Sequence, residues 1–317
     1  MENVNSGVDV FKTGRKKRKG RKNSIGDIIF YILNYTFFAL FTLLCAFPFY
    51  YLFINTISDN ELIKAGTITF IPRGVHFDNY IALTGVHNLG AAILVSVSRT
   101  VLGTVLTVLA SAFSGYLATK KEMWARQFWY RFMVVTMYFN AGLIPWYLNM
   151  SMLGLTNNFM AYIIPSIVAP FNIILVKTFI ESIPGELEES AAIDGAGYIR
   201  RFIMIIFPLC KPILATIAVF SALGHWNSFI DSLILMGGRP ELQTLQHKLY
   251  NYLQKTSNLK ALMDSGRAIT AEMVKQTLNE RSIKFTVAMV SIVPILCVYP
   301  FLQKYFQRGI MIGAVKG

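Results

Sequence analysis

The sequence predicts an all-α integral membrane protein with six transmembrane helices. Of its 317 residues, 54% are hydrophobic and only 15% are charged, which is too apolar for a soluble domain. Apolar segments long enough to cross a bilayer recur along the chain. A strongly basic stretch precedes the first of them, as is typical of a segment held on the cytoplasmic side of a membrane.

Residues 1–27 form a basic cytoplasmic arm that accounts for much of the net charge of +13. Its cations are Lys12, Arg15, Lys16, Lys17, Arg18, Lys19, Arg21 and Lys22. Such a run can bind nucleic acid. It lies directly against a hydrophobic stretch, however, so positive-inside retention and attraction to anionic membrane lipid explain it more economically. No nucleic-acid partner is therefore expected.

Residues 28–317 are predicted to form one membrane domain. Windows of about twenty residues place its spans near 28–54, 91–118, 129–149, 159–180, 209–236 and 283–302. With the arm inside, the loop that carries Lys120, Lys121 and Arg126 is also inside, whereas the connection around Gly154 is outside and carries no Lys or Arg. We expect a multi-pass protein of the inner (cytoplasmic) cell membrane with both termini in the cytoplasm.

A polar, helical loop at 181–208 separates the fourth and fifth predicted spans. Pro184 suits the first turn of a helix of about ten residues, and Gly195 can supply its left-handed stop. Acidic residues fill the first turn, where the helix dipole favours anions: Glu186, Glu188 and Glu189. A second helical stretch runs from Tyr198 to Phe207, before Pro208 re-enters the apolar phase. The pattern predicts an L-shaped cytoplasmic elbow that contacts a partner.

This elbow resembles the EAA loop of binding-protein-dependent ABC importer permeases. The matching residues are Glu189-Ser190-Ala191, Gly195 after three intervening residues, and Ile205-x-Phe207-Pro208 after nine more. Ser190 replaces the usual Ala and Phe207 the usual Leu, which are mild departures. The segment from Glu188 to Ala196 is similar to the carbohydrate branch of these MetI-like permeases, specifically to the maltose-type second subunit. The alternative is an ordinary capped helical loop.

The resemblance implies half of the translocation pathway of an ATP-driven carbohydrate importer, with an oligosaccharide as the expected cargo. It implies four kinds of contact: a second, related permease subunit, two ATPase subunits, an extracytoplasmic sugar-binding protein and membrane lipid. It assigns ATPase coupling to Glu188, Glu189, Ser190, Ala191, Ala192, Asp194, Gly195, Ile205, Phe207 and Pro208.

Two further segments carry the same resemblance. An outer loop resembles the one that these permeases insert into the cleft of their binding protein: Gly237, Gly238, Arg239, Pro240 and Glu241. The C-terminal tail resembles the one that reaches between the ATPase subunits, with a frayed terminus as the alternative: Gly313, Ala314, Val315, Lys316 and Gly317.

Polar groups inside spans are costly and indicate function or structural hydrogen bonding. Tyr138, Asn140 and Asn172 are candidates to face a polar substrate pathway, and interhelical hydrogen bonding is an equally good use of the amides. Arg99 either snorkels to the interface or lines the pathway. Asp231 is expected only to mark the outer interface.

Trp226 and Asn227, next to His225, form a further candidate for the pathway. An aromatic face beside an amide can stack on a sugar ring and hydrogen-bond its hydroxyls, and the family resemblance includes both residues. A helix break packed against its neighbours is the alternative.

Several motifs are absent from the sequence. It has no Gly-x-x-x-x-Gly-Lys-Ser/Thr phosphate loop, no His-Glu-x-x-His zinc helix and no Gly-x-Ser-x-Gly elbow. We therefore expect no catalytic residues, no metal site and no cofactor in this chain, with ATP and Mg used by partner subunits. A stand-alone secondary carrier or channel, and an ABC permease for a non-sugar solute, are the alternatives.

Overall fold

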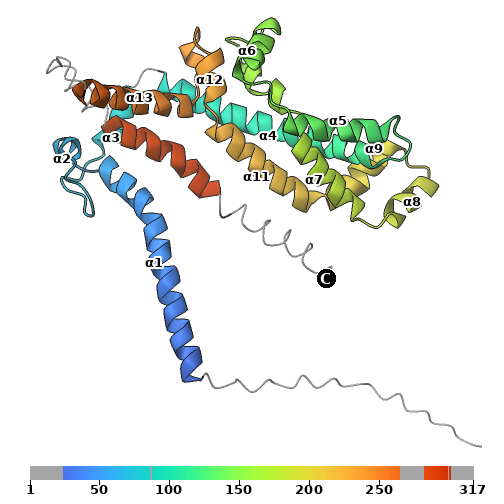
Figure 1. The fold of residues 1–317 in the computed structure, drawn as a ribbon, viewed down its shortest axis with the longest axis horizontal. Coiled ribbons are helices and arrows are strands. Elements are labelled where there is room, and N and C mark those ends of the chain that lie inside the picture. The colour runs from blue at the N-terminus through green and yellow to red at the C-terminus, as the bar shows by residue number, and fades with distance from the viewer. Residues whose placement is uncertain (1–23, 86–87, 265–281, 299, 301–317) are drawn as a thin grey trace, which may run out of the picture. The chain divides into compact units, whose positions relative to one another are not determined.

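The computed structural model describes residues 24–85, 88–264, 282–298 and 300, and within these ranges the regular elements are all helical (Figure 1). The chain divides into two compact units, residues 1–50 and 51–317. Most of helix α1 (Ile25–Thr56) belongs to the first unit. Helix α1 is long and apolar enough to cross a membrane.

The second unit begins with the last turn of α1 and continues through a series of helices. These are α2 (Asn60–Ala65), α3 (Asp78–Thr84), α4 (Leu89–Thr119), α5 (Arg126–Tyr138), α6 (Leu143–Met152), the 3₁₀ turns η1 (Phe159–Tyr162) and η2 (Ile164–Ser166), α7 (Pro170–Glu181), α8 (Glu186–Ile193), α9 (Tyr198–Arg201), the π-helical turn η3 (Phe202–Ile206), α10 (Phe207–Leu209), α11 (Lys211–Asn227), α12 (Ile230–Leu235), the 3₁₀ turn η4 (Pro240–Leu242) and α13 (Leu245–Asp264). A further apolar helix runs over Ser282–Val298.

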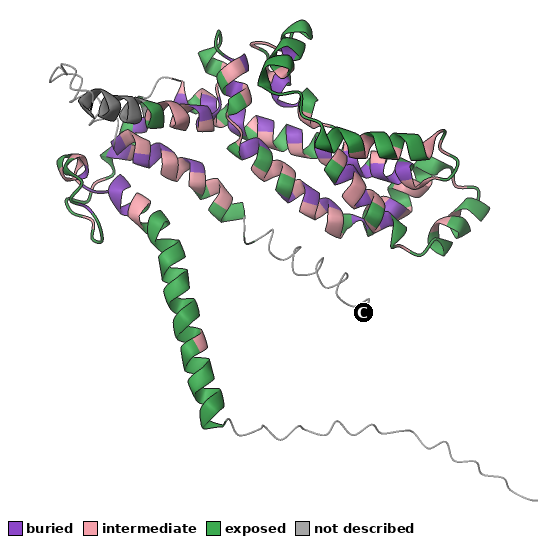
Figure 2. Cartoon of the chain, in the orientation of Figure 1, coloured by how far each residue is buried: buried purple, intermediate pink, exposed green. Residues whose placement is uncertain are grey.

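Helix α4 is the central element of the second unit. It packs against α7 and α11, and buried residues concentrate where these helices meet (Figure 2). Glycines permit the close approach, because a Cβ on Gly115 would lie 2.7 Å from the Val176 side chain and one on Gly103 would overlap the His225 ring. The contact between α4, α7 and the elbow region buries Ala112, Tyr116, Val176, Ile180, Ile206, Cys210, Leu214 and Ile217.

A second buried cluster closes the other end of α4. It joins Val95 on α4 to Tyr162, to the Met150–Leu155 turn and to the end of α12 at Leu235. The last turn of α1 contributes Ile54 to a smaller cluster with Ile63, Ile68 and Phe285. These clusters leave the middle of α4 facing α7 and α11, where the polar residues of the candidate pathway lie.

The predicted spans correspond only partly to single helices. In the described residues, α1 and α4 are each long and apolar enough to span, and two bent pairs qualify as broken spans: Phe159–Ser166 with Pro170–Glu181, at 42°, and Tyr198–Leu209 with Lys211–Asn227, at 79°. The predicted span 129–149 is interrupted between α5 and α6, where Gly142 has φ +86°. The predicted span 209–236 breaks between α11 and α12. The all-helical membrane fold is confirmed, and the count of six spans stays a prediction.

Candidate functional site

The elbow begins with α8 and, after a turn at Gly195, continues through α9, η3 and α10. This glycine has φ +79°, the left-handed conformation that the sequence predicts, and Ala196 N–H donates to the Ala191 carbonyl at 2.9 Å across the turn. Helix α8 has eight residues instead of about ten. It is shorter because Pro184 and Gly185 precede the helix and the turn at Asp194 closes it.

Most of the predicted coupling residues lie on the surface of α8. Glu189, Ser190, Ala192, Asp194 and Gly195 are exposed, and Ala191 is half-buried. Two large apolar side chains, Leu187 and Ile193, are 46% and 86% exposed on the same short helix. These two side chains leave apolar surface on α8 uncovered.

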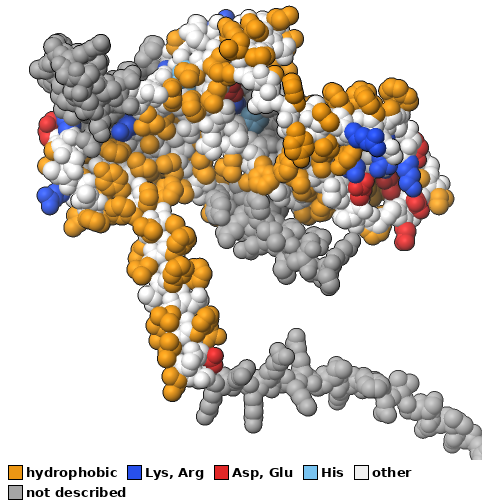
Figure 3. All heavy atoms as spheres, viewed as in Figure 1, with side chains coloured by type: hydrophobic (Ala, Val, Ile, Leu, Met, Phe, Trp, Pro, Cys, Tyr) orange, Lys and Arg blue, Asp and Glu red, His pale blue; other side chains and the backbone are white. Residues whose placement is uncertain are grey.

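Glu188 differs from its neighbours because it points back toward α4. Its carboxylate accepts a hydrogen bond of 2.8 Å from the Tyr116 hydroxyl, is ion-paired with Lys120, and lies 3.4 Å from the guanidinium of Arg201. Lys120 also lies over the Tyr116 ring, 4.1 Å from its centroid. We call these four residues, Tyr116, Lys120, Glu188 and Arg201, the latch. Figure 3 shows Lys and Arg side chains beside Asp and Glu side chains at the end of the unit that carries α8.

The latch fixes the ionised form of Glu188. Burial alone raises the pKa of this carboxyl, but the hydrogen bonds from Lys120 and Tyr116 and the charges of Lys120 and Arg201 outweigh it, so the pKa is lowered from its ordinary value of 4.5. The latch therefore joins an anion on α8 to cations from the end of α4 and from α9. Neither Tyr116 nor Lys120 has a sequence motif that marks it as a partner of Glu188, which is 72 and 68 residues away.

The second half of the elbow anchors it to the core. Ile205 and Phe207 pack against the cluster around Tyr116 and Ile206. The centroid of the Phe202 ring lies 5.2 Å from that of Tyr116 and 5.8 Å from that of Phe207. Pro208 is exposed and precedes the 79° bend into α11. These three predicted coupling residues therefore position the elbow, while the residues of α8 present its surface.

A cavity of about 430 Å³ lies between α4, α7 and α11. Its lining combines three aromatic rings with hydroxyl, amide and imidazole groups: Trp146, Tyr162, Phe220, Thr107, Ser166, Ser221, Asn172 and His225. Aromatic faces with convergent hydrogen-bonding groups form the kind of site that binds a sugar. Of the predicted pathway residues, Asn172 lines this cavity and is buried.

The other predicted pathway residues lie elsewhere. Tyr138 is 85% exposed at the end of α5, and the Asn140 side chain accepts a 2.9 Å hydrogen bond from Gly142 N–H in the turn before α6. Trp226 is buried among Leu83, Leu89, Leu245 and Val287, and its indole N–H donates to the Ser291 carbonyl at 2.9 Å. Asn227 is exposed at the end of α11. Among the described residues, the contacts of Trp226 are those of a packed side chain.

An ion pair in the cavity wall was missed by the sequence analysis. Arg99 on α4 is only 3% exposed, and its guanidinium binds both carboxylate oxygens of Asp231. It also donates to the Ser228 carbonyl at 3.2 Å and lies 4.6 Å from the Tyr162 ring centroid. Arg99 therefore does not snorkel: of its two alternatives, it lies in the lining of the cavity, and Asp231, expected only to mark the outer interface, is its ion-pair partner there. The two residues are 132 positions apart in the sequence. The one sequence signal for the pair is that each charge lies in an apolar segment.

The outer loop is exposed and tied to the neighbouring loop. Gly237 through Glu241 are exposed, and Gly238 N–H donates to the Asn157 side chain at 2.9 Å. The Tyr162 hydroxyl donates to the Leu242 carbonyl at 2.7 Å, so the loop sits over the wall of the cavity. The tail residues Gly313 to Gly317 lie outside the described residues.

An all-helical membrane protein with a polar cavity beside its central helix, and with an exposed elbow joined to that helix, has the architecture of a transport permease. The chain belongs to the family described as binding-protein-dependent transport system inner membrane component, whose model matches residues 107–312. It is therefore a multi-pass membrane permease component of the ABC transport type, and not an enzyme.

Individual relatives cover almost the whole chain. The polygalacturonan/rhamnogalacturonan transport system permease protein YtcP of Bacillus subtilis is 31% identical over 291 residues, which are 91% of this chain and 99% of the relative. The arabinooligosaccharides transport system permease protein AraQ of Halalkalibacterium halodurans is 27% identical over 88% of this chain and 94% of the relative.

A solved structure agrees with the fold. A chain in the crystal structure of a bacterial ABC transporter involved in the import of the acidic polysaccharide alginate matches with a TM-score of 0.77 and 27% identity. The match covers 90% of this chain and 99% of that chain. The MetI-like resemblance of the sequence is confirmed by these comparisons.

Proposed function

We propose that this chain forms half of the translocation pathway of an ATP-driven importer of carbohydrate, with an oligosaccharide as cargo. The observation that carries the proposal is the 430 Å³ cavity beside α4, whose aromatic rings, hydroxyls and amide suit a sugar. Relatives named for polygalacturonan, rhamnogalacturonan and arabinooligosaccharide transport support the same cargo class. The import direction is supported by the similarity to a transporter involved in alginate import.

The proposed assembly contains a second, related permease subunit, two ATPase subunits and an extracytoplasmic sugar-binding protein. The ATPase subunits hydrolyse ATP with Mg and receive the exposed face of α8, which carries Glu189, Ser190 and Ala192. The loop from Gly237 to Glu241 faces the binding protein, and the tail from Gly313 reaches the ATPase interface. This arrangement places both termini in the cytoplasm and the complex in the inner (cytoplasmic) membrane.

Helix α4 links the two ends of the proposed mechanism. Tyr116 and Lys120 hold α8 at one end of it, while Thr107 and Arg99 line the cavity farther along. From Arg99 to Tyr116 the helix extends about 25 Å, at 1.5 Å per residue. When the ATPase subunits close, they move α8. Because the latch binds α8 to the end of α4, α4 moves with it as a rigid body. The cavity then changes its accessibility across the membrane.

Co-purification and ligand binding test this proposal. The tagged chain, isolated from its native membrane, should bring down two ATPase chains and a different permease, and the co-purified binding protein should bind oligosaccharides in a screen that also contains peptides and free amino acids. Binding of peptides alone would overturn the carbohydrate assignment. Isolation without any ATPase chain, together with solute uptake by this chain alone in liposomes, would instead identify a secondary carrier or channel.

A further inference from the structure

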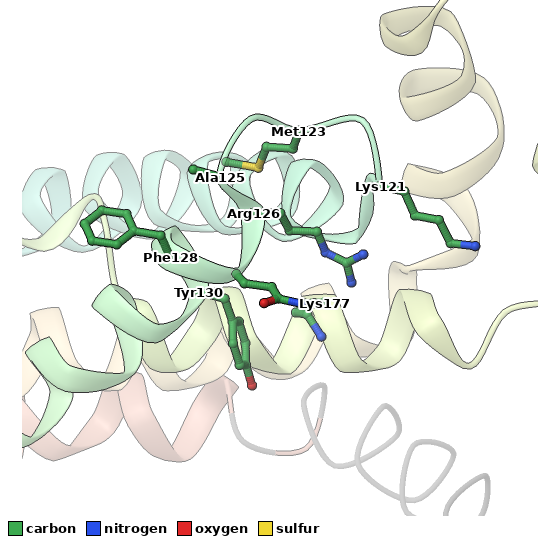
Figure 4. Close-up of a pocket in the computed structure, with 8 residues that line it drawn as sticks. Lys121, Met123, Ala125, Arg126, Phe128, Tyr130 and Lys177 are labelled. Carbon is green, nitrogen blue, oxygen red and sulfur yellow. The ribbon is translucent and has the colours of Figure 1, made fainter.

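A second cavity, of about 540 Å³, lies where the loop after α4, the first turn of α5 and the face of α7 meet (Figure 4). Three basic residues line it: Lys121 from the loop, Arg126 from the start of α5 and Lys177 from α7. Its lining contains no acidic residue. Neither this cavity nor its cations take part in the proposed transport mechanism.

The cations exceed the negative charge that compensates them. Glu181 accepts from Lys177 at 2.8 Å and lies 3.4 Å from the Arg126 guanidinium, so one carboxylate serves two cations. Arg126 also donates through Nε to the Ala118 carbonyl at 2.9 Å, which fixes its side chain and leaves Nη1 without a partner among the described residues. The exposed ammonium of Lys121 has no partner in the same part of the chain.

Two further features favour an anion in this cavity: the start of helix α5 and the ring of Tyr130. Helix α5 has 13 residues and begins at Arg126, so the positive end of its dipole borders the cavity, although the Arg126 N–H already donates to the Met123 carbonyl at 3.3 Å. The Lys177 ammonium lies 4.8 Å from the Tyr130 ring centroid, which holds it beside Arg126 (Figure 4). Fixed cations lose less side-chain entropy when a ligand binds.

Apolar side chains beside the cavity indicate where its ligand comes from. Trp124, Phe128 and Phe132 are 80%, 60% and 52% exposed, and Phe128 itself lines the cavity. Exposed aromatic rings next to basic residues at the end of membrane helices are typical of the interfacial region, where lipid headgroups lie. Basic pockets between such helix ends bind acidic lipid headgroups.

We propose that this cavity binds the phosphodiester headgroup of an anionic phospholipid, with Lys121, Arg126 and Lys177 around the phosphate and the exposed rings of Trp124 and Phe128 against the acyl chains. A free phosphate ion would use the cations but gain nothing from Trp124 and Phe128. The volume of about 540 Å³ lies within the range of small-molecule sites. This inference rests on the membrane location of the chain and not on its cargo.

The test measures retained lipid on the full-length chain and on its complete complex. Each is purified in mild detergent, exposed to phosphatidylglycerol or to phosphatidylcholine with the same acyl chains, and analysed by native mass spectrometry. We expect specific retention of phosphatidylglycerol. Lys121→Gln, a change at an exposed residue, should weaken retention about fivefold, which is the effect of about 1 kcal/mol per cation. Arg126→Gln should do the same or more.

Arg131→Gln provides the matched control. It removes an exposed cation from the same helix α5, outside the cavity, and should leave retention unchanged. Equal retention by Lys121→Gln, Arg126→Gln and Arg131→Gln would overturn the proposal. Displacement of the lipid by millimolar inorganic phosphate would show a phosphate site instead. If the isolated chain retained phosphatidylglycerol but the complete complex did not, an acidic segment of a partner subunit would occupy the cavity in the complex. That result would overturn the lipid assignment as well.

Discussion

The buried hydroxyl of Tyr116 donates a 2.8 Å hydrogen bond to the carboxylate of Glu188 and so joins the membrane helix α4 to the exposed helix α8. Tyr116 on α4 is 1% exposed. On α8, by contrast, the residues other than Glu188 and Ala191 are exposed. A second acceptor, the Tyr198 carbonyl at 3.3 Å, brings α9 to the same hydroxyl. The link between the elbow and the transmembrane helices therefore converges on one side chain.

Tyr116→Phe should weaken coupling while preserving the fold. The substitution keeps the ring that packs against Phe202 and removes a hydrogen bond to a charged group, at a cost of about 1.5 to 3 kcal/mol. We expect lower ATPase stimulation by the binding protein in reconstituted complexes, with normal assembly. Tyr147→Phe, at a hydroxyl with no partner among the described residues, is the control. Equal stimulation in both variants would remove Tyr116 from the coupling pathway.

The latch should be insensitive to pH across the physiological range. Because the pKa of Glu188 is lowered below 4.5, its ionised form stabilises the folded state fully above that value, and this contribution is lost as the pH falls through the lower, folded-state pKa. The difference in melting temperature between wild type and Glu188→Gln should stay constant from about pH 6 to 8 and shrink below about pH 4.5. A difference that shrinks between pH 6 and 7 would contradict the ion-paired carboxylate.

The buried pair of Arg99 and Asp231 should behave as a unit in a double-mutant cycle. Arg99→Leu leaves the Asp231 carboxylate without its cation and should destabilise the complex by about 3 to 5 kcal/mol, whereas adding Asp231→Leu should restore part of that loss. Thermal unfolding of the three variants measures the coupling energy. Additive effects of the two substitutions would show that the pair does not act together.

The elbow was the most predictable part of the molecule, because capping, dipole and glycine signals are local in sequence. Gly195 has the predicted left-handed conformation, whereas Pro184, expected in the first turn of the helix, lies just before it, because Gly185 is the N-cap and α8 begins at Glu186. The contacts of Glu188 with Tyr116 and Lys120 and the Arg99–Asp231 pair were not predictable, since they join residues 72, 68 and 132 positions apart that only helix packing brings together. The surroundings of Trp226 were not predictable for the same reason. Its indole could stack on a sugar, but Val287 and Ser291, more than 60 positions later, bury it.

Substitutions at Trp226 and Asn172 should have opposite signatures. Trp226→Ala empties a packed site and should destabilise the complex by about 3 to 5 kcal/mol, while surviving molecules transport at the normal rate. Asn172→Ala removes a hydrogen-bonding group from the cavity wall and should lower uptake with a smaller change in melting temperature. Uptake and melting temperature are measured on the same preparations. Reversed signatures would move Trp226 to the pathway and Asn172 to the core.

Gly195→Val should uncouple the elbow through backbone strain. Nothing lies within 4 Å of a Cβ at this position, so the cost comes from the φ of +79°, which disfavours a β-branched residue by more than about 1 kcal/mol. Gly195→Asn, which tolerates this conformation, should retain coupling. Gly197→Ala also has open space and an ordinary φ of −68°, so it should be neutral. Wild-type ATPase stimulation in Gly195→Val would exclude a role for this turn.

The most direct test of the transport account is uptake of a labelled oligosaccharide, chosen as a ligand of the co-purified binding protein, into proteoliposomes. Vesicles that contain the complete complex, with the binding protein on one side and ATP on the other, should accumulate the sugar. Vesicles with this chain and its permease partner but no ATPase subunits should not. Accumulation that requires neither ATP nor the ATPase subunits would contradict the account.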